Sequence, residues 1–211
     1  MTAINDDTLC KNTPFLQGEA DERELCATDK VTLRRHLLAK RDSLPAKERK
    51  ALDRAICERV AALPCFQEAT AVLTYVPVGS EIDVRELTRE AWKRGVPVGL
   101  PVCNREAKTL TFRRARPDVP TVTGAFGIPV PPENAEIVVP DERTVCILPA
   151  LAYDENRIRL GYGGGYYDRF LVGFRGIAVG VVYGVNVLET VFAEPHDRPA
   201  AILVTEAGIR E

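Results

Sequence analysis

Apolar residues recur every three or four positions in the first half of the chain. In residues 30–44 this spacing places Leu33 and Leu37 on one side of a helix, and a similar stripe runs through residues 47–63. Such periodicity is typical of amphipathic helices that pack one face against a core. A third helix of this kind is predicted over residues 83–94.

Runs of β-branched and other apolar residues predict strands in the remainder of the chain. The predicted strands are residues 71–77, 96–102, 109–114, 144–151, 177–183 and 201–205. Several runs are apolar at nearly every position, which is typical of parallel strands that helices cover on both faces. We therefore predict an α/β sandwich with a mostly parallel sheet. Residues 115–140 are rich in proline and glycine and are predicted to form a long loop.

Composition and charge indicate a globular protein. The chain has 211 residues, 45% hydrophobic and 27% charged, with a formal charge of −2. These values exclude a collagen, a coiled coil and a wholly disordered chain. Residues 1–29 hold seven acidic and two basic side chains, whereas residues 30–211 have a net charge of +3. We expect a single domain over residues 30–211 after an acidic extension with a short helix near residues 19–26, and neither nucleic acid nor a membrane as partner.

The cysteines and the chain start favour a reducing compartment. The six cysteines form no CxxC pair and show no zinc-type spacing, so we expect reduced thiols. No apolar run reaches the ~18–20 residues of a membrane span, and the polar, acidic start is unlike a secretory signal. A cytoplasmic protein is predicted, with a monomer as the expected oligomeric state.

The most informative segment is a glycine-rich run between a predicted strand and a predicted helix. Residues 159–171 read RLGYGGGYYDRFL, with four glycines in five positions. Glycine allows positive φ and close backbone approach, and a helix N-terminus offers free N–H groups, so phosphate is the natural ligand. The spacing is neither that of a P-loop nor that of the dinucleotide fingerprint. A flexible surface turn is the alternative interpretation.

A basic stripe borders the apolar face of the first predicted helix. Lys30, Arg34 and Arg41 lie close together on a helical wheel, where their stems can be held while their charged ends converge on an anion. A solvated helix surface is the alternative. Arg35 and Lys40 face elsewhere and are predicted to be solvated.

Three carboxylates lie beside predicted strands or the glycine run. Asp168 and Asp197 could hold Mg²⁺ next to a bound phosphate, or they could cap a helix and a turn. Glu81 follows a buried strand, where ligands of open α/β sheets gather, although it could also cap the next helix. With two histidines and no Ser-His or Cys-His order, nucleophilic triad chemistry is disfavoured.

Together these segments resemble the 5-formyltetrahydrofolate cyclo-ligase family, also called methenyltetrahydrofolate synthetase, over about residues 30–206. The matching motifs are K-x-x-L-R from Lys30 to Arg34, Tyr75-x-Pro77 before Glu81-Ile82-Asp83, Leu100-Pro101, Gly127-Ile128-Pro129, RLGYGGGYYDRFL, and Asp197-x-Pro199. Two positions depart from the pattern, because Ala201 stands where many members carry Asp and no acidic residue precedes Pro131. The resemblance implies a three-layer α/β/α sandwich with a Rossmann-like sheet.

The resemblance also implies roles for individual residues. ATP would bind Lys30, Arg34, Arg159, Leu160, Gly161, Tyr162, Gly163, Gly164, Gly165, Tyr166 and Tyr167. Arg159 and Tyr167 would be the catalytic residues. Val76, Glu81 and Tyr166 would bind folate, with the Glu81 carboxylate accepting hydrogen bonds from the pterin. Asp168 and Asp197 would bind Mg²⁺.

The implied reaction is the ATP- and Mg²⁺-dependent cyclisation of 5-formyltetrahydrofolate to 5,10-methenyltetrahydrofolate, with release of ADP and phosphate. The formyl oxygen would take the γ-phosphoryl group, and N10 of the folate would then displace phosphate. No protein nucleophile is needed, because positioning and charge neutralisation carry phosphoryl transfer. Two alternatives stay open: a catalytically weak paralogue that binds nucleotide or folate in a regulatory role, and a sugar-phosphate-binding domain of similar fold.

Overall fold

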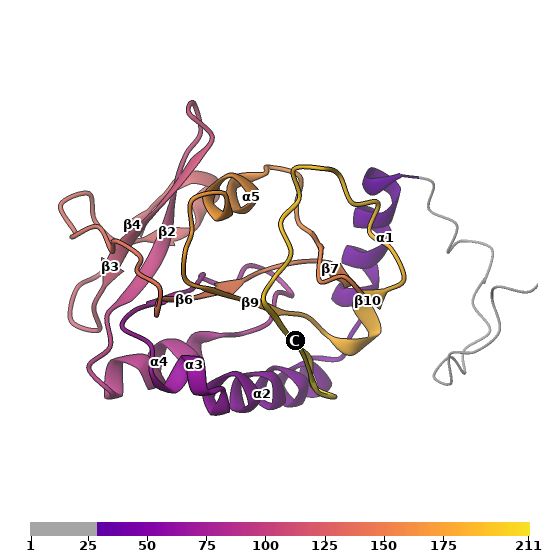
Figure 1. Cartoon of the computed structure of the whole chain (residues 1–211), viewed down its shortest axis with the longest axis horizontal. Coiled ribbons are helices and arrows are strands. Elements are labelled where there is room, and N and C mark those ends of the chain that lie inside the picture. Colours follow the sequence, from indigo (N-terminus) through magenta and orange to yellow (C-terminus); the bar gives the residue numbers. More distant parts are fainter. Residues whose placement is uncertain (1–28) are drawn as a thin grey trace, which may run out of the picture.

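The computed structural model describes residues 29–211 (Figure 1), so the short helix predicted near residues 19–26 lies outside the described residues. Helix α1 spans Lys30–Asp42 and begins after Asp29, whose carboxylate accepts hydrogen bonds from the N–H groups of Val31 (2.7 Å) and Thr32 (2.9 Å). Such a cap satisfies two of the free N–H groups of the first turn. The first predicted helix is confirmed.

Four further helices follow α1. Their bounds are α2 (Ala46–Ala62), α3 (Pro64–Gln67), α4 (Arg85–Lys93) and α5 (Tyr166–Leu171). The periodicity had predicted α2 and α4 to within a few residues, whereas the four-residue helix α3 is too short to show a period. None of the helices in residues 29–211 has the length and apolarity that crossing a lipid bilayer requires.

A seven-stranded sheet forms the centre of the molecule, in the order β12-β11-β9-β6-β1-β2-β3. Its strands are β1 (Val72–Leu73), β2 (Val98–Asn104), β3 (Thr109–Ala115), β6 (Val145–Leu148), β9 (Ile177–Val181), β11 (Ile202–Val204) and β12 (Ile209–Arg210). The five inner strands are parallel, while β3 and β12 pair antiparallel at the two edges. The predicted mostly parallel α/β sheet is confirmed, although β1, β6, β9 and β11 are shorter than predicted.

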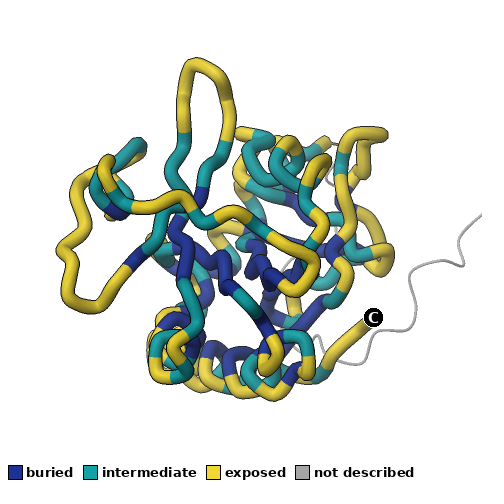
Figure 2. The backbone as a smooth tube through the Cα atoms, turned by 60° about the vertical axis from the view of Figure 1, so that its left-hand side comes forward, coloured by how far each residue is buried: buried dark blue, intermediate teal, exposed yellow. Residues whose placement is uncertain are grey.

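Alternate residues of the inner strands face opposite helix layers. Val145 and Ile147 pack in the cluster that contains α2, α3 and α4, whereas Cys146 and Leu148 pack in the cluster that contains α5. A strand that is covered on both sides needs apolar residues at every position, which explains the uninterrupted apolar run. Figure 2 shows the buried backbone gathered in the middle of the molecule and along the inner sides of the helices.

A small second sheet holds α1 in place. Its strands are β7 (Ala152–Asp154), β8 (Arg159–Leu160) and β10 (Val187–Leu188). Leu33 and Leu37 of α1 pack with Leu151, Ala152 and Leu160 in a separate apolar cluster. This sheet was not predicted, and it fixes both α1 and the start of the glycine-rich run.

The segment 115–140 is mostly irregular, as predicted, but contains regular pieces. Strands β4 (Val122–Thr123) and β5 (Pro129–Val130) pair antiparallel around a single 3₁₀ turn at Ala125–Gly127. Phe126 in this turn adopts a positive φ of 61° and is 59% exposed. The turn therefore presents an aromatic ring on the side of the molecule that carries the site described next.

Candidate active site

The loops that follow β1, β6 and β8 surround a cavity of about 680 Å³. Strands β1 and β6 belong to the central sheet, and the carboxyl ends of its parallel strands are where ligands of open α/β folds bind. Every residue that the sequence assigned to ATP, folate or metal lines the cavity, namely Lys30, Arg34, Val76, Glu81, residues 159–168 and Asp197. The fold thus brings together residues that lie up to 167 positions apart in sequence.

The glycine-rich run forms one wall of the cavity. Gly163 (φ +92°) and Gly165 (φ +65°) both adopt left-handed conformations, which favour glycine. Arg34 Nε donates a hydrogen bond of 2.8 Å to the carbonyl of Gly161, so α1 holds the loop from outside. Leu160 is only 1% exposed and packs against α1, so its side chain is not available to a ligand.

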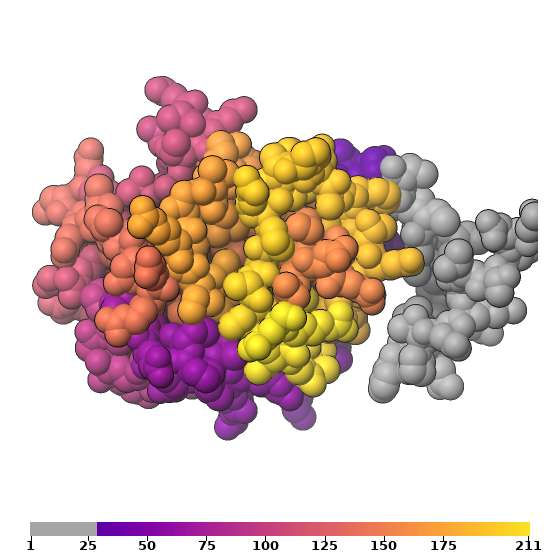
Figure 3. Space-filling model, in the orientation of Figure 1, coloured from indigo at the N-terminus to yellow at the C-terminus, as the bar shows by residue number. Residues whose placement is uncertain are grey.

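A basic group from α1 meets acidic groups from the loop before β11. Lys30 Nζ lies 2.6 Å from Glu194 and 2.9 Å from Asp197. Partial burial opposes the charge of Lys30, but the two carboxylates outweigh it and raise its pKa. Figure 3 shows this late segment in contact with the start of α1. Asp197 also accepts a hydrogen bond from the N–H of Glu194 (2.8 Å), so it closes a turn, as one of the two interpretations expected.

Arg159 and Asp168 form a partly buried ion pair. Arg159 Nη2 lies 2.5 Å from Asp168 Oδ1, and the side chain of Arg159 is 3% exposed. The guanidinium carbon also lies 5.9 Å from the centre of the Tyr167 ring. Asp168 does not cap α5, whose N-cap is Gly165 without a side-chain hydrogen bond. The capping interpretation of Asp168 is therefore wrong.

A second part of the lining, called the aromatic wall below, is apolar and aromatic. It is lined by Tyr75, Val76, Pro101, Cys103, Leu110, Phe126, Ile128 and Tyr166. The rings of Phe126 and Tyr166 meet edge to face with centroids 6.4 Å apart. This wall suits a flat, partly aromatic ligand, whereas the Lys30 end suits an anion.

Glu81 lies in the turn that leads from β1 to α4. Its carboxylate accepts a hydrogen bond of 2.9 Å from the N–H of Val78. The helix α4 begins at Arg85 with Val84 as N-cap, so the interpretation of Glu81 as a cap of this helix is wrong. The carboxylate lines the cavity and has acceptor capacity left for a ligand.

Comparisons with known proteins agree with this geometry. The sequence model described as "5-formyltetrahydrofolate cyclo-ligase family" matches residues 27–206. The chain belongs to the 5-formyltetrahydrofolate cyclo-ligase family. A cyclo-ligase from Mycolicibacterium smegmatis is 34% identical over 177 residues, covering 80% of this chain and 89% of the relative. One from Haemophilus influenzae is 30% identical over 164 residues, covering 75% and 88%.

Solved structures show the same cyclo-ligase fold. The NMR structure of Aquifex aeolicus 5,10-methenyltetrahydrofolate synthetase is 35% identical, with a TM-score of 0.75 over 86% of this chain and 91% of that one. The Mycoplasma pneumoniae synthetase is 20% identical with a TM-score of 0.68, covering 84% and 99%, and supports the fold alone.

Several residues of the cyclo-ligase cavity had no predicted role. Phe126, Ser80 and Glu194 line it, and so does the buried Arg41, which the helical wheel placed on the basic stripe but to which the resemblance gave no role. Glu194, His196 and Asp197 also place donor atoms within 4.8 Å of one another. The sequence pointed to a possible metal site through the acidic residues of this loop, whereas an isolated serine or phenylalanine suggests no particular role.

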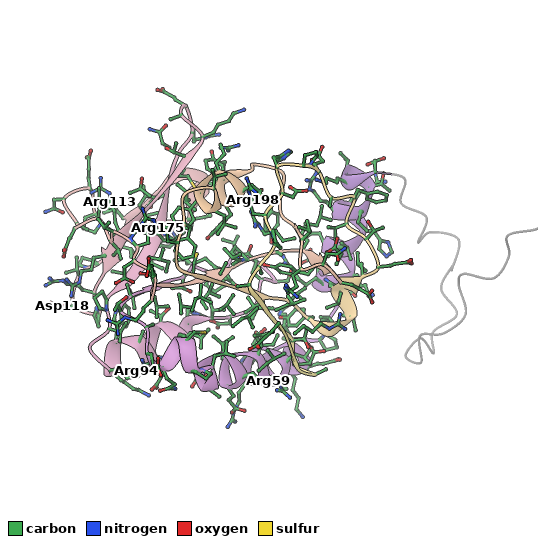
Figure 4. All side chains as sticks on the ribbon, viewed as in Figure 1. Arg59, Arg94, Arg113, Asp118, Arg175 and Arg198 are labelled. Atoms are coloured by element: carbon green, nitrogen blue, oxygen red, sulfur yellow. The ribbon has the colours of Figure 1, made fainter. Side chains whose placement is uncertain are left out.

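Other arginines lie far from this cavity. Figure 4 shows Arg59 on α2 and Arg94 at the end of α4, along the helix layer that faces away from α5. Only part of the net positive charge of residues 30–211 therefore comes from side chains at the cavity.

Proposed function

We propose that this chain catalyses the cyclisation that defines its family, the ATP-dependent conversion of 5-formyltetrahydrofolate to 5,10-methenyltetrahydrofolate with release of ADP and phosphate. One observation carries the proposal: a single cavity of about 680 Å³ joins a cationic, glycine-lined end to an apolar wall with a carboxylate. The first end suits a triphosphate, and the second suits a reduced pterin with its aminobenzoyl group.

ATP is proposed to bind between α1 and the glycine-rich run. Lys30, Arg34 and Arg159 would neutralise the phosphates, and the backbone from Leu160 to Tyr167 would follow them closely. The left-handed glycines support this role, because a side chain at Gly163 would point at the guanidinium of Arg34, 3.4 Å away. Close backbone approach to phosphate is a common use of glycine-rich loops.

The folate is proposed to lie along the aromatic wall. Val76 and Tyr166 would contact its rings. Glu81 would accept hydrogen bonds from the amide-like edge of the pterin, because a carboxylate suits two adjacent N–H donors. Tyr166 joins the two sites, since it follows the glycines directly and faces Phe126.

The chemistry needs positioning and charge more than a protein nucleophile. The formyl oxygen attacks the γ-phosphorus, the bond to ADP breaks, and an imidate-type phosphate forms. N10 then attacks the activated carbon, phosphate leaves, and the N10 proton is released. Arg159 is proposed to stabilise the charge on the transferring group. Burial raises the pKa of Tyr167 well above its ordinary value, so its phenol stays protonated and can donate a hydrogen bond to an oxygen of the reacting groups.

Mg²⁺ is proposed to be held by Asp168 and Asp197. Both carboxylates line the cavity, and carboxylate oxygens together with phosphate oxygens are the donors that Mg²⁺ prefers, so the residues present fit this ion. When bound, the ion would neutralise phosphate charge. Within residues 29–211 each carboxylate is paired with a basic side chain, Arg159 or Lys30, and that side chain would turn to phosphate oxygens.

A direct assay tests the activity. The protein is mixed with 5-formyltetrahydrofolate and Mg·ATP, and the near-ultraviolet absorbance of the methenyl product is followed together with ADP release. We expect both signals to rise only when ATP is present. Folate binding in calorimetry without an ATP-dependent rise in absorbance would instead favour a binding protein without catalytic activity.

A further inference from the structure

Helix α1 carries a third basic residue at the cavity, and it differs from Lys30 and Arg34. Arg41 is only 4% exposed and lines the cavity. Among residues 29–211 it forms no ion pair, unlike Lys30 and Arg159. A buried charge is costly unless hydrogen bonds satisfy it, so the partners of this guanidinium indicate what holds it there.

Those partners come from three loops at the carboxyl ends of three strands. Arg41 Nε donates to Ser80 Oγ (2.9 Å), after β1, and Nη2 donates to the Tyr162 hydroxyl (2.7 Å), after β8. A longer contact of 3.5 Å joins Nη1 to the carbonyl of Ala150, after β6. The planar guanidinium can hold several loops in one fixed geometry, which an ammonium cannot do.

Two of these loops carry the groups proposed above to bind the two substrates. Ser80 directly precedes Glu81 of the folate site. Tyr162 lies between Gly161 and Gly163 of the ATP site. Arg41 belongs to α1 and hydrogen-bonds to both loops, so it connects them without being part of either.

Further interactions of Ser80 and Tyr162 extend this hydrogen-bond network toward the proposed folate site. The Ser80 hydroxyl donates to the carboxylate of Asp42, so its oxygen is free to accept from Arg41. Burial and the nearby charge of Glu81 raise the pKa of the Tyr162 phenol, while Arg41 opposes them. The charges of both Arg41 and Glu81 therefore act on this phenol.

We infer that Arg41 is a positioning residue that couples the two substrate sites, so that nucleotide bound at the glycine-rich run strengthens folate binding at Glu81. The inference rests on the proposed function, which assigns the two loops to their substrates. Nucleotide that orders Tyr162 fixes Arg41, and Arg41 in turn fixes Ser80 and the turn that holds Glu81. By linkage, folate strengthens nucleotide binding by the same factor.

Calorimetry measures this coupling without turnover. 5-Formyltetrahydrofolate is titrated into the protein alone and into the protein saturated with Mg²⁺ and an ATP analogue whose β,γ-bridge is an imido group. For the wild type we expect folate affinity to rise about tenfold with the analogue bound, within the range typical of coupled sites. In Tyr162→Phe and in Arg41→Lys, we expect the two folate affinities to agree within about twofold.

The choice of variants separates a loss of coupling between the two sites from a general loss of folate binding. Tyr162→Phe removes one hydroxyl from a half-exposed ring and decides the question alone if Arg41→Lys does not fold. A purely structural role would lower both folate affinities and leave their ratio unchanged. Arg35→Gln, an exposed change on the same helix, is the matched control and should keep the wild-type ratio.

The outcomes distinguish this inference from the proposed function. A wild-type ratio near one, or an unchanged ratio in Tyr162→Phe, overturns the coupling while both ligands still bind. A wild type that binds neither folate nor nucleotide overturns the proposed function and the coupling with it. The inference is supported if the ratio of folate affinities with and without the analogue falls to near one in both variants and stays at the wild-type value in Arg35→Gln.

Discussion

Lys30 Nζ lies 2.9 Å from the carboxylate of Asp197 and so joins the first turn of α1 to the loop before β11. The ammonium that we propose for phosphate is thus paired with a carboxylate that we propose for Mg²⁺. Each group has to give up part of this contact when Mg·ATP binds. In the absence of ligand, the ammonium of Lys30 and the carboxylate of Asp197 neutralise each other's charge, so both can stay at the cavity.

Replacing Asp197 by Asn should therefore change the requirement for Mg²⁺. The neutral amide is a weaker ligand, and we expect the Mg²⁺ concentration for half-maximal rate to rise by about tenfold or more. Initial rates at fixed ATP and varied Mg²⁺ measure this. Glu189→Gln, the same kind of change at an exposed position that does not line the cavity, is the control and should keep the wild-type requirement. An unchanged Mg²⁺ requirement in Asp197→Asn would remove this residue from the metal site.

Arg34→Ala should weaken the ATP site. Arg34 Nε donates to the carbonyl of Gly161 at 2.8 Å, and we propose that the rest of its guanidinium contacts phosphate. We expect kcat/KM for ATP to fall about 10- to 100-fold, which corresponds to roughly 1.4–2.7 kcal/mol of lost transition-state stabilisation. Steady-state kinetics with varied ATP measure the effect, and the exposed Arg35→Ala is the matched control. Equal kinetics in both variants would contradict a role for Arg34 in the site.

Gly163→Ala should distort the same loop from within. An alanine at φ +92° is strained by roughly 1–2 kcal/mol, and its Cβ would lie 3.4 Å from the Arg34 guanidinium carbon. We expect KM for ATP to rise more than KM for folate. Gly173→Ala adds the same methyl group where nothing lies within 4 Å, so it should leave both values unchanged. A Gly163→Ala enzyme with wild-type ATP kinetics would show that the backbone does not follow the phosphates closely.

The sequence predicted the parts of this molecule that depend on local periodicity. The helices α1, α2 and α4 bury one repeating apolar face, and the inner strands bury apolar residues on both faces. Both patterns are visible in the sequence residue by residue. The glycine-rich run was visible because four glycines in five positions are costly without a purpose. Their left-handed conformations at Gly163 and Gly165 fit that interpretation.

The small sheet could not be predicted, because its strands are held by distant partners. Val187 of β10 pairs with Tyr153 of β7, and β8 has only two residues. Strands of this length have no period to detect. For the same reason the helical wheel placed Arg41 on the basic stripe but gave no sign of its burial or of its partners Ser80 and Tyr162, which lie 39 and 121 positions away.

A buried carboxylate far from the cavity predicts how stability depends on pH. Asp53 of α2 is 7% exposed and accepts a hydrogen bond of 2.6 Å from the Tyr183 hydroxyl. Burial raises the pKa of Asp53 above its ordinary value of 3.8, although the hydrogen bond from Tyr183 opposes the rise. The folded state therefore holds this proton more firmly than the unfolded chain does. The resulting stabilisation is fully present below pH 3.8 and is lost as pH rises through the folded-state pKa.

Asp53→Asn, which cannot ionise, removes this dependence. We expect the free energy of unfolding of the wild type, relative to the variant, to fall as pH rises from about 4 to 7, as measured by urea denaturation. Tyr183→Phe should steepen the fall, because the ionised carboxylate loses its donor. Asp118→Asn removes the same formal charge in an exposed loop (Figure 4) and controls for net charge. A difference between wild type and Asp53→Asn that stays constant over this range would show that Asp53 ionises as readily in the folded protein as in the unfolded chain.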